Sequence, residues 1–312
     1  MGWDPDRLLP GDHEEENMKK YLALLLSGVV AASLAACGSS NASDTAATAA
    51  AAATTAAEAA TEAPAADAAA QSASGSAIDL SQDKYAGDGV LTVGTNATFP
   101  PFEEVGDDGK PAGFDIDLMN AIGEKLGVEV EWQDLEFDSL VASIGTKIDA
   151  AASGMTITEE RKKAVNFSDP YYDATQCVLL PTDSTAAAID DLKELKIGVQ
   201  SGTTGETISR ESISDANTVA YNGFNQAVND LVNGKVGAVV IDTAPAAAFQ
   251  AQYPDQLKVV DGSVFGFDVE QYGIALPKDD QALTDAVNQA LQELKDDGTY
   301  DKLIAQDINA AQ

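Results

Sequence analysis

A regular alternation of short β-type and helix-type segments from residue 90 onward constrains the fold of this chain most strongly. Residues 90–95 (VLTVGT) are rich in β-branched side chains, and residues 115–127 (DIDLMNAIGEKLG) carry apolar side chains at helical spacing. A strand at 128–135, a helix at 137–146 and a strand at 148–154 follow in the same order. This βαβ alternation predicts a parallel sheet that is covered by helices.

The second half of the chain repeats the pattern. The expected elements are strands at 195–199 and 235–243, a loop entering a helix at 201–211, a helix at 225–234 and a terminal helix pair at 284–304. Residues 143–156 (SIGTKIDAAASGMT) and 231–244 (LVNGKVGAVVIDTA) share one order of features, which is a helix end, a lysine, a strand and a polar tip. We interpret this similarity as a weak internal duplication, which predicts two similar α/β lobes.

Ligands of α/β lobes bind at the carboxyl ends of strands and at the N-termini of helices. The segments that meet this condition lie at 94–99, 153–161, 200–205 and 241–243. We therefore expect the functional side chains of both lobes to come from these segments.

The segment 153–163 (SGMTITEERKK) departs from the usual residue pattern of a helix N-terminus. Thr158 is typical of a helix N-cap, and a capping box would place Glu or Gln three residues later. Arg161 stands there instead, although a cation at a helix N-terminus is unfavourable by roughly 0.3–1 kcal/mol. The residues alone leave two interpretations open: a surface ion pair with Glu160 or Asp169, or a binding role for Arg161.

The charge and the residue inventory exclude several function classes. The chain of 312 residues carries 51 acidic and 18 basic side chains, a formal charge of −33. This excess argues against nucleic acid or an anionic membrane surface as a partner, since both require Lys/Arg patches. His13 is the single histidine, and the cysteines are Cys37 and Cys177. If the N-terminus is removed, His-based catalytic sites and ordinary zinc sites are excluded, and we expect neither a metal nor a cofactor.

The N-terminal part is predicted to be an export signal and a tether. Residues 18–36 have a charged start and a short apolar stretch. Their last three residues and Cys37 form a Leu-Ala-Ala-Cys sequence that resembles the bacterial lipobox. Cys37 is then the acylated (palmitoylated) residue, and residues 37–77, rich in Ala, Thr and Ser, form a tether. Residues 1–17 suit no signal peptide and are interpreted as a start-site extension. The expected location is the outer face of the cytoplasmic membrane, through a lipid anchor.

Several motifs occur in the order that one protein family shows. They are TFPPFE (98–103), GFDIDLMNAIGEKL (113–126), SGMTITEERKKAVNFSDPYY (153–172), GTTGE (202–206), QYGIALPKDD (271–280) and DGTYDKL (297–303). Together they resemble the family-3 extracellular solute-binding proteins, which are the polar amino-acid receptors of ABC importers. The resemblance covers about residues 90–303.

The resemblance implies a type II periplasmic-binding-protein-like α/β fold. Two lobes would be joined by two crossing strands, at 171–176 and 268–272. Lobe 1 would contain 86–170 plus 273–305, and lobe 2 would contain 177–267.

The resemblance also assigns roles to residues at the strand tips. Arg161 matches the arginine that binds the ligand carboxylate, and Gly154 and Thr156 would add backbone and hydroxyl contacts. Asp242 matches the acid that binds the ligand ammonium. Thr204 would reach the carboxylate from the second lobe with its hydroxyl and N–H groups.

Two aromatic and two amide residues match positions around the ligand side chain. Phe99 and Phe137 would form aromatic walls, although either could be an ordinary core residue. Asn96 lies where relatives that bind basic amino acids often carry aspartate, and Gln200 lies where the glutamine-binding branch carries lysine. Because both are neutral here, we expect a polar uncharged ligand: glutamine first, then Asn, Ser, Cys or cystine. A receptor for cystine or a basic amino acid is the alternative.

We therefore expect a monomeric binding protein, not an enzyme. It would capture a free L-amino acid by lobe closure and deliver it to the transmembrane subunits of an ABC permease. An enzyme similar to cyclohexadienyl dehydratase is a rival on the same fold, because arogenate is itself an amino acid. A sensor domain and an inert surface adhesin are the other rivals.

Overall fold

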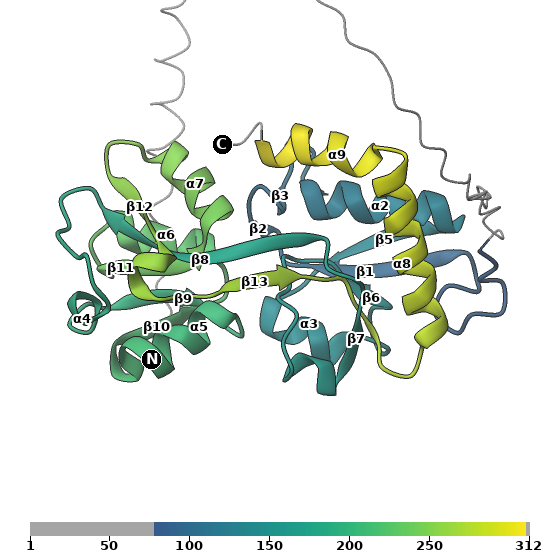
Figure 1. Ribbon diagram of the computed structural model, residues 1–312, viewed down its shortest axis with the longest axis horizontal. Coiled ribbons are helices and arrows are strands. Elements are labelled where there is room, and N and C mark those ends of the chain that lie inside the picture. Colours follow the sequence, from purple (N-terminus) through teal and green to yellow (C-terminus); the bar gives the residue numbers. More distant parts are fainter. Residues whose placement is uncertain (1–77, 310–312) are drawn as a thin grey trace, which may run out of the picture. The chain divides into compact units, whose positions relative to one another are not determined.

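Two separate β-sheets organise residues 78–309, the part of the chain that this computed structural model describes (Figure 1). The export signal, Cys37, the tether and the start-site extension lie outside the described residues. Each sheet is covered by helices, so the expectation of two α/β lobes is confirmed.

The sheet of lobe 1 has the strand order β5-β1-β6-β14-β7. Its strands are β1 (Val90–Thr95), β5 (Glu129–Asp134), β6 (Ala150–Ala151), β7 (Val165–Phe167) and β14 (Ala275–Pro277). Strand β1 pairs in parallel with β5 and β6, as the βαβ pattern predicts, whereas β14 runs antiparallel to β6 and β7. The helices of this lobe are α2 (Phe114–Leu126), α3 (Phe137–Ser143), α8 (Gln281–Asp296) and α9 (Thr299–Leu303). A small sheet of β2 (Thr98–Phe99), β3 (Glu103–Val105) and β4 (Pro111–Ala112) lies beside α2.

Helix α2 shows why the sequence pattern predicts a helix in this part of lobe 1. Its buried face carries Phe114, Leu118, Met119 and Ile122, which recur at helical spacing. Burial of each such side chain contributes roughly 1.5–3 kcal/mol relative to exposure. The helix ends at Gly127, whose left-handed backbone (φ 72°) directs its N–H to the carbonyl groups of the last turn.

The sheet of lobe 2 has the order β10-β9-β11-β8-β12. Its strands are β8 (Tyr172–Pro181), β9 (Ile197–Gln200), β10 (Thr218–Tyr221), β11 (Ala238–Asp242) and β12 (Leu257–Asp261). Strands β9, β10 and β11 are parallel, and β8 and β12 are antiparallel additions. The helices are α4 (Ile189–Leu192), α5 (Thr204–Ile208), α6 (Phe224–Val232) and α7 (Thr243–Gln252).

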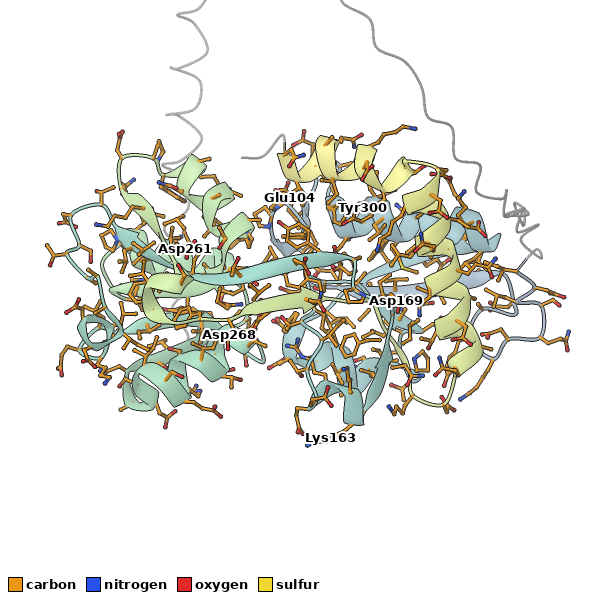
Figure 2. The ribbon with its side chains drawn as sticks, viewed as in Figure 1. Glu104, Lys163, Asp169, Asp261, Asp268 and Tyr300 are labelled. Carbon is orange, nitrogen blue, oxygen red and sulfur yellow. The ribbon has the colours of Figure 1, made fainter. Side chains whose placement is uncertain are left out.

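Two strands run side by side between the lobes (Figure 1). The first residues of β8 pair antiparallel with β13 (Val269–Tyr272), and the later residues of β8 pair with β11 and β12. Tyr300, labelled in the upper part of Figure 2, donates a hydrogen bond from its hydroxyl to the carbonyl of Tyr171, which anchors the start of β8 to lobe 1. Cys177 lies fully buried within β8.

Some expected elements are shorter in the structure. The strand expected at 148–154 is reduced to Ala150–Ala151, because the chain leaves the sheet at Gly154, whose φ is 50°. The helix expected after Thr158 is a single 3-10 turn, Arg161–Lys163. At 201–211, where a loop that enters a helix was expected, the helix is α5, which begins at Thr204 and continues into a π-helical turn at Ser209–Ser214. Among residues 78–309, no helix combines the length and the apolar composition that a membrane crossing requires.

Candidate functional site

A narrow pocket lies between the two lobes and is lined by most of the predicted residues. Its lining includes Phe99, Phe137, Gly154, Thr156, Arg161, Gln200, Thr204 and Asp242. The side chains come from strand ends and helix starts of both lobes, as the topology of α/β lobes predicts.

Arg161 is a largely buried cation at the wall of this pocket. Its backbone N–H donates to Oγ1 of Thr158 over 3.1 Å, so Thr158 does cap the turn. The guanidinium donates from Nη1 to the carbonyl of Thr156 (2.7 Å) and from Nη2 to the carbonyl of Gly202 in the other lobe (2.9 Å). Burial lowers the pKa of Arg161 to about 10, while the carboxylates of Glu270 and Asp242 oppose this shift. Arg161 therefore stays charged at neutral pH, and its N–H groups can donate hydrogen bonds to a bound anion.

Asp242 supplies an acidic group from the other lobe. It ends β11 and stands at the N-cap position of α7, but its side chain makes no capping hydrogen bond. Its side chain is buried, and Oδ1 has no hydrogen-bond partner among the described residues. Burial, together with the nearby charge of Glu270, raises the pKa of Asp242 to about 7. An ammonium group beside Asp242 would favour the ionised form of this carboxyl group and donate a hydrogen bond to Oδ1.

Glu270, on β13, accepts hydrogen bonds from hydroxyl groups of both lobes. The sequence analysis did not predict that this residue belongs to the site. Its Oε2 accepts hydrogen bonds from Oγ1 of Thr156 (3.1 Å) and Oγ1 of Thr204 (2.8 Å). Nε2 of Gln176, on β8, donates to the same oxygen over 3.2 Å. An acid on a crossing strand, immediately before the QYGIA motif, was the available signal in the sequence.

Glu103 is a second buried acid in the pocket that the sequence analysis did not assign. It is 1% exposed, and its Oε1 accepts a hydrogen bond from Oγ of Ser153 over 3.0 Å. Ser153 also lines the pocket and receives a hydrogen bond from the backbone N–H of Asn96 (3.0 Å). Burial, followed by the charge of Asp115, raises the pKa of Glu103 well above its usual value. The motif TFPPFE contains Glu103, so an acid beside buried aromatic residues was the missed signal.

Asn96 is the one predicted contact residue that does not line the pocket. Its Oδ1 accepts a hydrogen bond from Nε2 of Gln200 over 2.7 Å, and its Nδ2 donates to the carbonyl of Leu135 over 2.7 Å. The amide thus connects the two lobes. Gln200, which does line the pocket, also donates to the carbonyl of Asn222 over 2.9 Å.

Aromatic rings form the apolar walls. Phe99 lies 5.4 Å from Phe224, measured between ring centroids, and Cζ of Arg161 lies 5.3 Å from the ring centroid of Phe137. Phe224, at the start of α6, was not predicted. Gly154 allows this packing, because a Cβ at that position would lie 2.7 Å from Cε1 of Phe99. Among residues 78–309, His, Cys, Asp and Glu side chains form no group of three or more that could hold a metal ion.

Comparisons with known proteins identify the family of this chain. The model of the bacterial extracellular solute-binding proteins, family 3, matches residues 91–308. The ABC transporter arginine-binding protein 1 of Escherichia coli (strain K12) is 38% identical over 219 residues, which cover 68% of this chain and 88% of that protein.

Solved structures agree in fold. An ancestral arginine-binding protein bound to glutamine is 43% identical with a TM-score of 0.66, over 70% of this chain and 97% of the other. The ancestral amino acid-binding protein AncCDT-1, a precursor of cyclohexadienyl dehydratase, is 37% identical with a TM-score of 0.67, over 73% of this chain and 99% of the other. The fold is therefore the type II periplasmic-binding-protein arrangement, and the chain belongs to the bacterial extracellular solute-binding proteins of family 3.

Proposed function

We propose that this protein is the extracellular receptor of an ABC importer and captures one free L-amino acid between its lobes. The observation that carries the proposal is the pairing of a part-buried cation from one lobe, Arg161, with a buried carboxyl from the other, Asp242, in one pocket. A free amino acid presents the complementary groups, a carboxylate and an ammonium, on a single carbon.

The roles of the main-chain subsite follow from this complementarity. Arg161 would bind the ligand carboxylate, with the hydroxyl of Thr156 and the backbone of Gly154 from lobe 1. Thr204 would reach the same carboxylate from lobe 2, and Asp242 would bind the ammonium. Because Asp242 is buried and Arg161 is partly buried, each would gain an opposite charge in a place where water screens it less than at the surface.

The ligand side chain would lie between Phe99 and Phe137 and point toward the end of the pocket marked by Gln200. The neutral residues Asn96 and Gln200 favoured glutamine as the first ligand. Glu103 adds a buried carboxyl that is linked through Ser153 to the same end. We therefore propose a ligand whose side chain ends in N–H donors, with arginine and glutamine as the first candidates and cystine as the alternative.

Capture would proceed by closure of the two lobes. Contacts between the lobes surround the pocket: Gln200 donates to Asn96, Arg161 to the carbonyl of Gly202, and Ser201 to Asp138 over 3.1 Å. A ligand that touches residues of both lobes stabilises the closed form. The closed form would then dock on the permease subunits as a monomer. Cys37 would carry the lipid anchor and residues 37–77 the tether, at the outer face of the cytoplasmic membrane.

Thermal-shift measurement of the purified protein against the standard amino acids and cystine tests the proposal. Binding raises the melting temperature as the ligand concentration exceeds Kd, so one or a few amino acids should give a clear shift. Arg161→Ala and Asp242→Asn should remove the shift and leave a folded protein.

Lys162→Ala is the matched control, because Lys162 is the exposed neighbour of Arg161 and pairs with Glu159 on the surface. This variant should keep the shift. If no amino acid raises the melting temperature of the folded wild-type protein, the receptor function is wrong.

A dehydratase activity is the second candidate, and Glu103 is the observation that favours it. A general acid must hold a proton at the pH at which the enzyme works. Burial raises the pKa of Glu103 well above its usual value, which favours the protonated form of this carboxyl group. Incubation of the protein with prephenate or arogenate, followed by detection of the aromatic product, separates the candidates. Turnover that is lost in Glu103→Gln would establish an enzyme, whereas binding without turnover supports the receptor.

A further inference from the structure

Glu270, on the crossing strand β13, accepts hydroxyl protons that the proposed binding site also needs. Its Oε2 lies 3.1 Å from Oγ1 of Thr156 and 2.8 Å from Oγ1 of Thr204, and both hydroxyl groups donate to it. Thr156 belongs to lobe 1 and Thr204 to lobe 2, and both line the pocket, whereas Glu270 is not among the lining residues. One carboxylate beside the pocket therefore binds a hydroxyl group of each lobe.

The number of protons limits what these hydroxyl groups can do. A hydroxyl group carries a single proton, and both threonine protons are directed to Glu270. Oγ1 of Thr204 also accepts a hydrogen bond from Nε2 of Gln176 over 3.4 Å, so this hydroxyl already has an acceptor and a donor as partners. A ligand carboxylate can accept the same protons only if the hydrogen bonds to Glu270 are broken or shared.

The charge of Glu270 acts in the same direction. Burial lowers the pKa of Arg161 to about 10, and the carboxylate of Glu270 opposes this shift, so it already compensates part of the positive charge. A ligand carboxylate at Arg161 would be repelled by the carboxylate of Glu270. Competition for protons and repulsion between carboxylates both weaken the binding of the ligand carboxylate.

The backbone keeps Glu270 beside Thr156. Ile157, which follows Thr156, donates from its backbone N–H to the carbonyl of Gln271, which follows Glu270, over 2.8 Å. The two side chains are therefore held as neighbours by the chain itself. An acceptor that is fixed in this way has a high effective concentration, and a ligand from solution has to compete with it.

We propose that Glu270 is an internal competitor for the ligand carboxylate, which lowers the affinity of the receptor and speeds the release of the ligand. The inference rests on the proposed amino-acid-binding function. When the ligand carboxylate binds Arg161, the hydroxyl groups of Thr156 and Thr204 rotate and donate to the ligand instead of Glu270. When the ligand leaves, Glu270 accepts both protons again, so neither hydroxyl group loses its acceptor during release.

Substitution of Glu270 should therefore tighten binding. Glu270→Gln removes the charge and keeps a carbonyl oxygen, which is a weaker acceptor than a carboxylate. L-Arginine and L-glutamine are titrated by isothermal titration calorimetry at pH 8, about one unit above the pKa of about 7 of Asp242, so that this carboxyl is largely ionised. We expect Kd of the bound ligand to fall by about tenfold. The dissociation rate, measured by surface plasmon resonance, should fall by a similar factor.

Asp268→Asn is the matched control for the loss of charge. Asp268 directly precedes β13, is exposed and is labelled in Figure 2. This variant loses the same charge without a contact to the two hydroxyl groups, and it should keep the Kd of the wild type. Equal tightening in Asp268→Asn and Glu270→Gln would indicate a general charge effect and overturn the proposal.

A double-mutant cycle with Thr204→Val tests the competition for protons. Thr204→Val removes one of the two hydroxyl groups and keeps a similar shape. In this background Glu270→Gln should lower Kd by about threefold instead of tenfold, since only the proton of Thr156 remains to be released. The same tenfold gain in both backgrounds would show that the hydroxyl protons are not what Glu270 withholds.

The sign of the effect separates this inference from a structural role. Damage to the fold raises Kd, whereas the proposal requires Kd to fall. If the ligand binds the wild type and Glu270→Gln leaves Kd unchanged or raises it, Glu270 is not a competitor and the receptor function stands. Glu270→Ala, which removes the acceptor as well as the charge, should tighten binding at least as much and decides the question if Glu270→Gln does not fold. Failure of both ligands to bind the folded wild type overturns the proposed ligands and the competitor role together.

Discussion

Asn96 of lobe 1 and Gln200 of lobe 2 are joined directly, with 2.7 Å between Oδ1 of Asn96 and Nε2 of Gln200. Both residues stand at strand ends, and their hydrogen bond lies at the edge of the pocket rather than inside it. The amide of Asn96 thus forms a contact between the lobes. Its lack of charge therefore suits this contact and gives little information about the charge of the ligand. A neutral residue here does not by itself argue against a charged ligand.

Removal of this contact should weaken ligand capture without disturbing either lobe. A typical hydrogen bond contributes about 1 kcal/mol, so Asn96→Ala should raise Kd for the cognate amino acid by roughly fivefold. Calorimetry measures the affinity, and small-angle X-ray scattering reports lobe opening. Asn225→Ala changes another amide near the same cleft edge, one whose side chain is exposed, and should leave Kd unchanged. Equal affinities of Asn96→Ala and the wild type would exclude a closing role for Asn96.

Gly202 should tolerate no side chain where the lobes meet. A Cβ added there would lie 2.8 Å from Cβ of Asp138 in the other lobe. Gly202→Ala should therefore hold the lobes apart and raise Kd by tenfold or more, on the order of 1.4 kcal/mol or above. Gly234→Ala is the control, because Gly234 has a similar φ (69° against 78°) and its Cβ would meet nothing within 4 Å. The backbone cost, roughly 1–2 kcal/mol, should be common to both variants, whereas the loss of affinity should appear only in Gly202→Ala.

Ligand affinity should fall in mildly acidic solution because of Asp242. The pKa of this carboxyl is raised to about 7, and it must be ionised to pair with an ammonium. The affinity for L-glutamine, the neutral-side-chain probe, should fall by about tenfold for each unit of pH below that value. Glu270→Gln removes one cause of the raised pKa and should move this acidic limb to lower pH. A pH-independent affinity between pH 5 and 7 would contradict the assignment of Asp242 to the ammonium.

The same buried acids should make the free energy of unfolding decrease as the pH rises. Burial raises the pKa of Asp115 to about 6 and of Asp242 to about 7, above the values near 3.8 that the unfolded chain has. Between these values the folded state binds more protons than the unfolded state, so stability is highest near the lower limit and is lost toward pH 7. Each group contributes up to about 1.4 kcal/mol per unit of pH across its window. Urea unfolding at pH 5 and pH 7.5 measures the trend, and Asp242→Asn should reduce its slope. An unfolding free energy that instead increases from pH 5 to pH 7.5 would show that these acids are ionised in the folded protein.

Local pattern was sufficient for much of the fold. Helix α2 and strand β1 were readable because burial on one side requires apolar residues at a fixed period, and that period is visible in the chain itself. The position of Arg161 was also informative alone, since a cation at a capping position conflicts with local electrostatics. The ligand contacts assigned to Arg161 and Asp242 remain proposals, although both residues line the pocket.

Only the tertiary structure determines which polar side chains, among them acids and amides, contact one another in the site. Thr156 meets Glu270 across 114 positions of the chain, and Asn96 meets Gln200 across 104. The raised pKa values of Glu103 and Asp115 likewise depend on burial, which only the folded chain provides. Period and composition determine which residues enter a helix, a strand or the core, because those preferences act between near neighbours. The charge state and partners of a buried polar group depend on groups brought together only by folding, and these long-range contacts leave no periodic trace in the sequence.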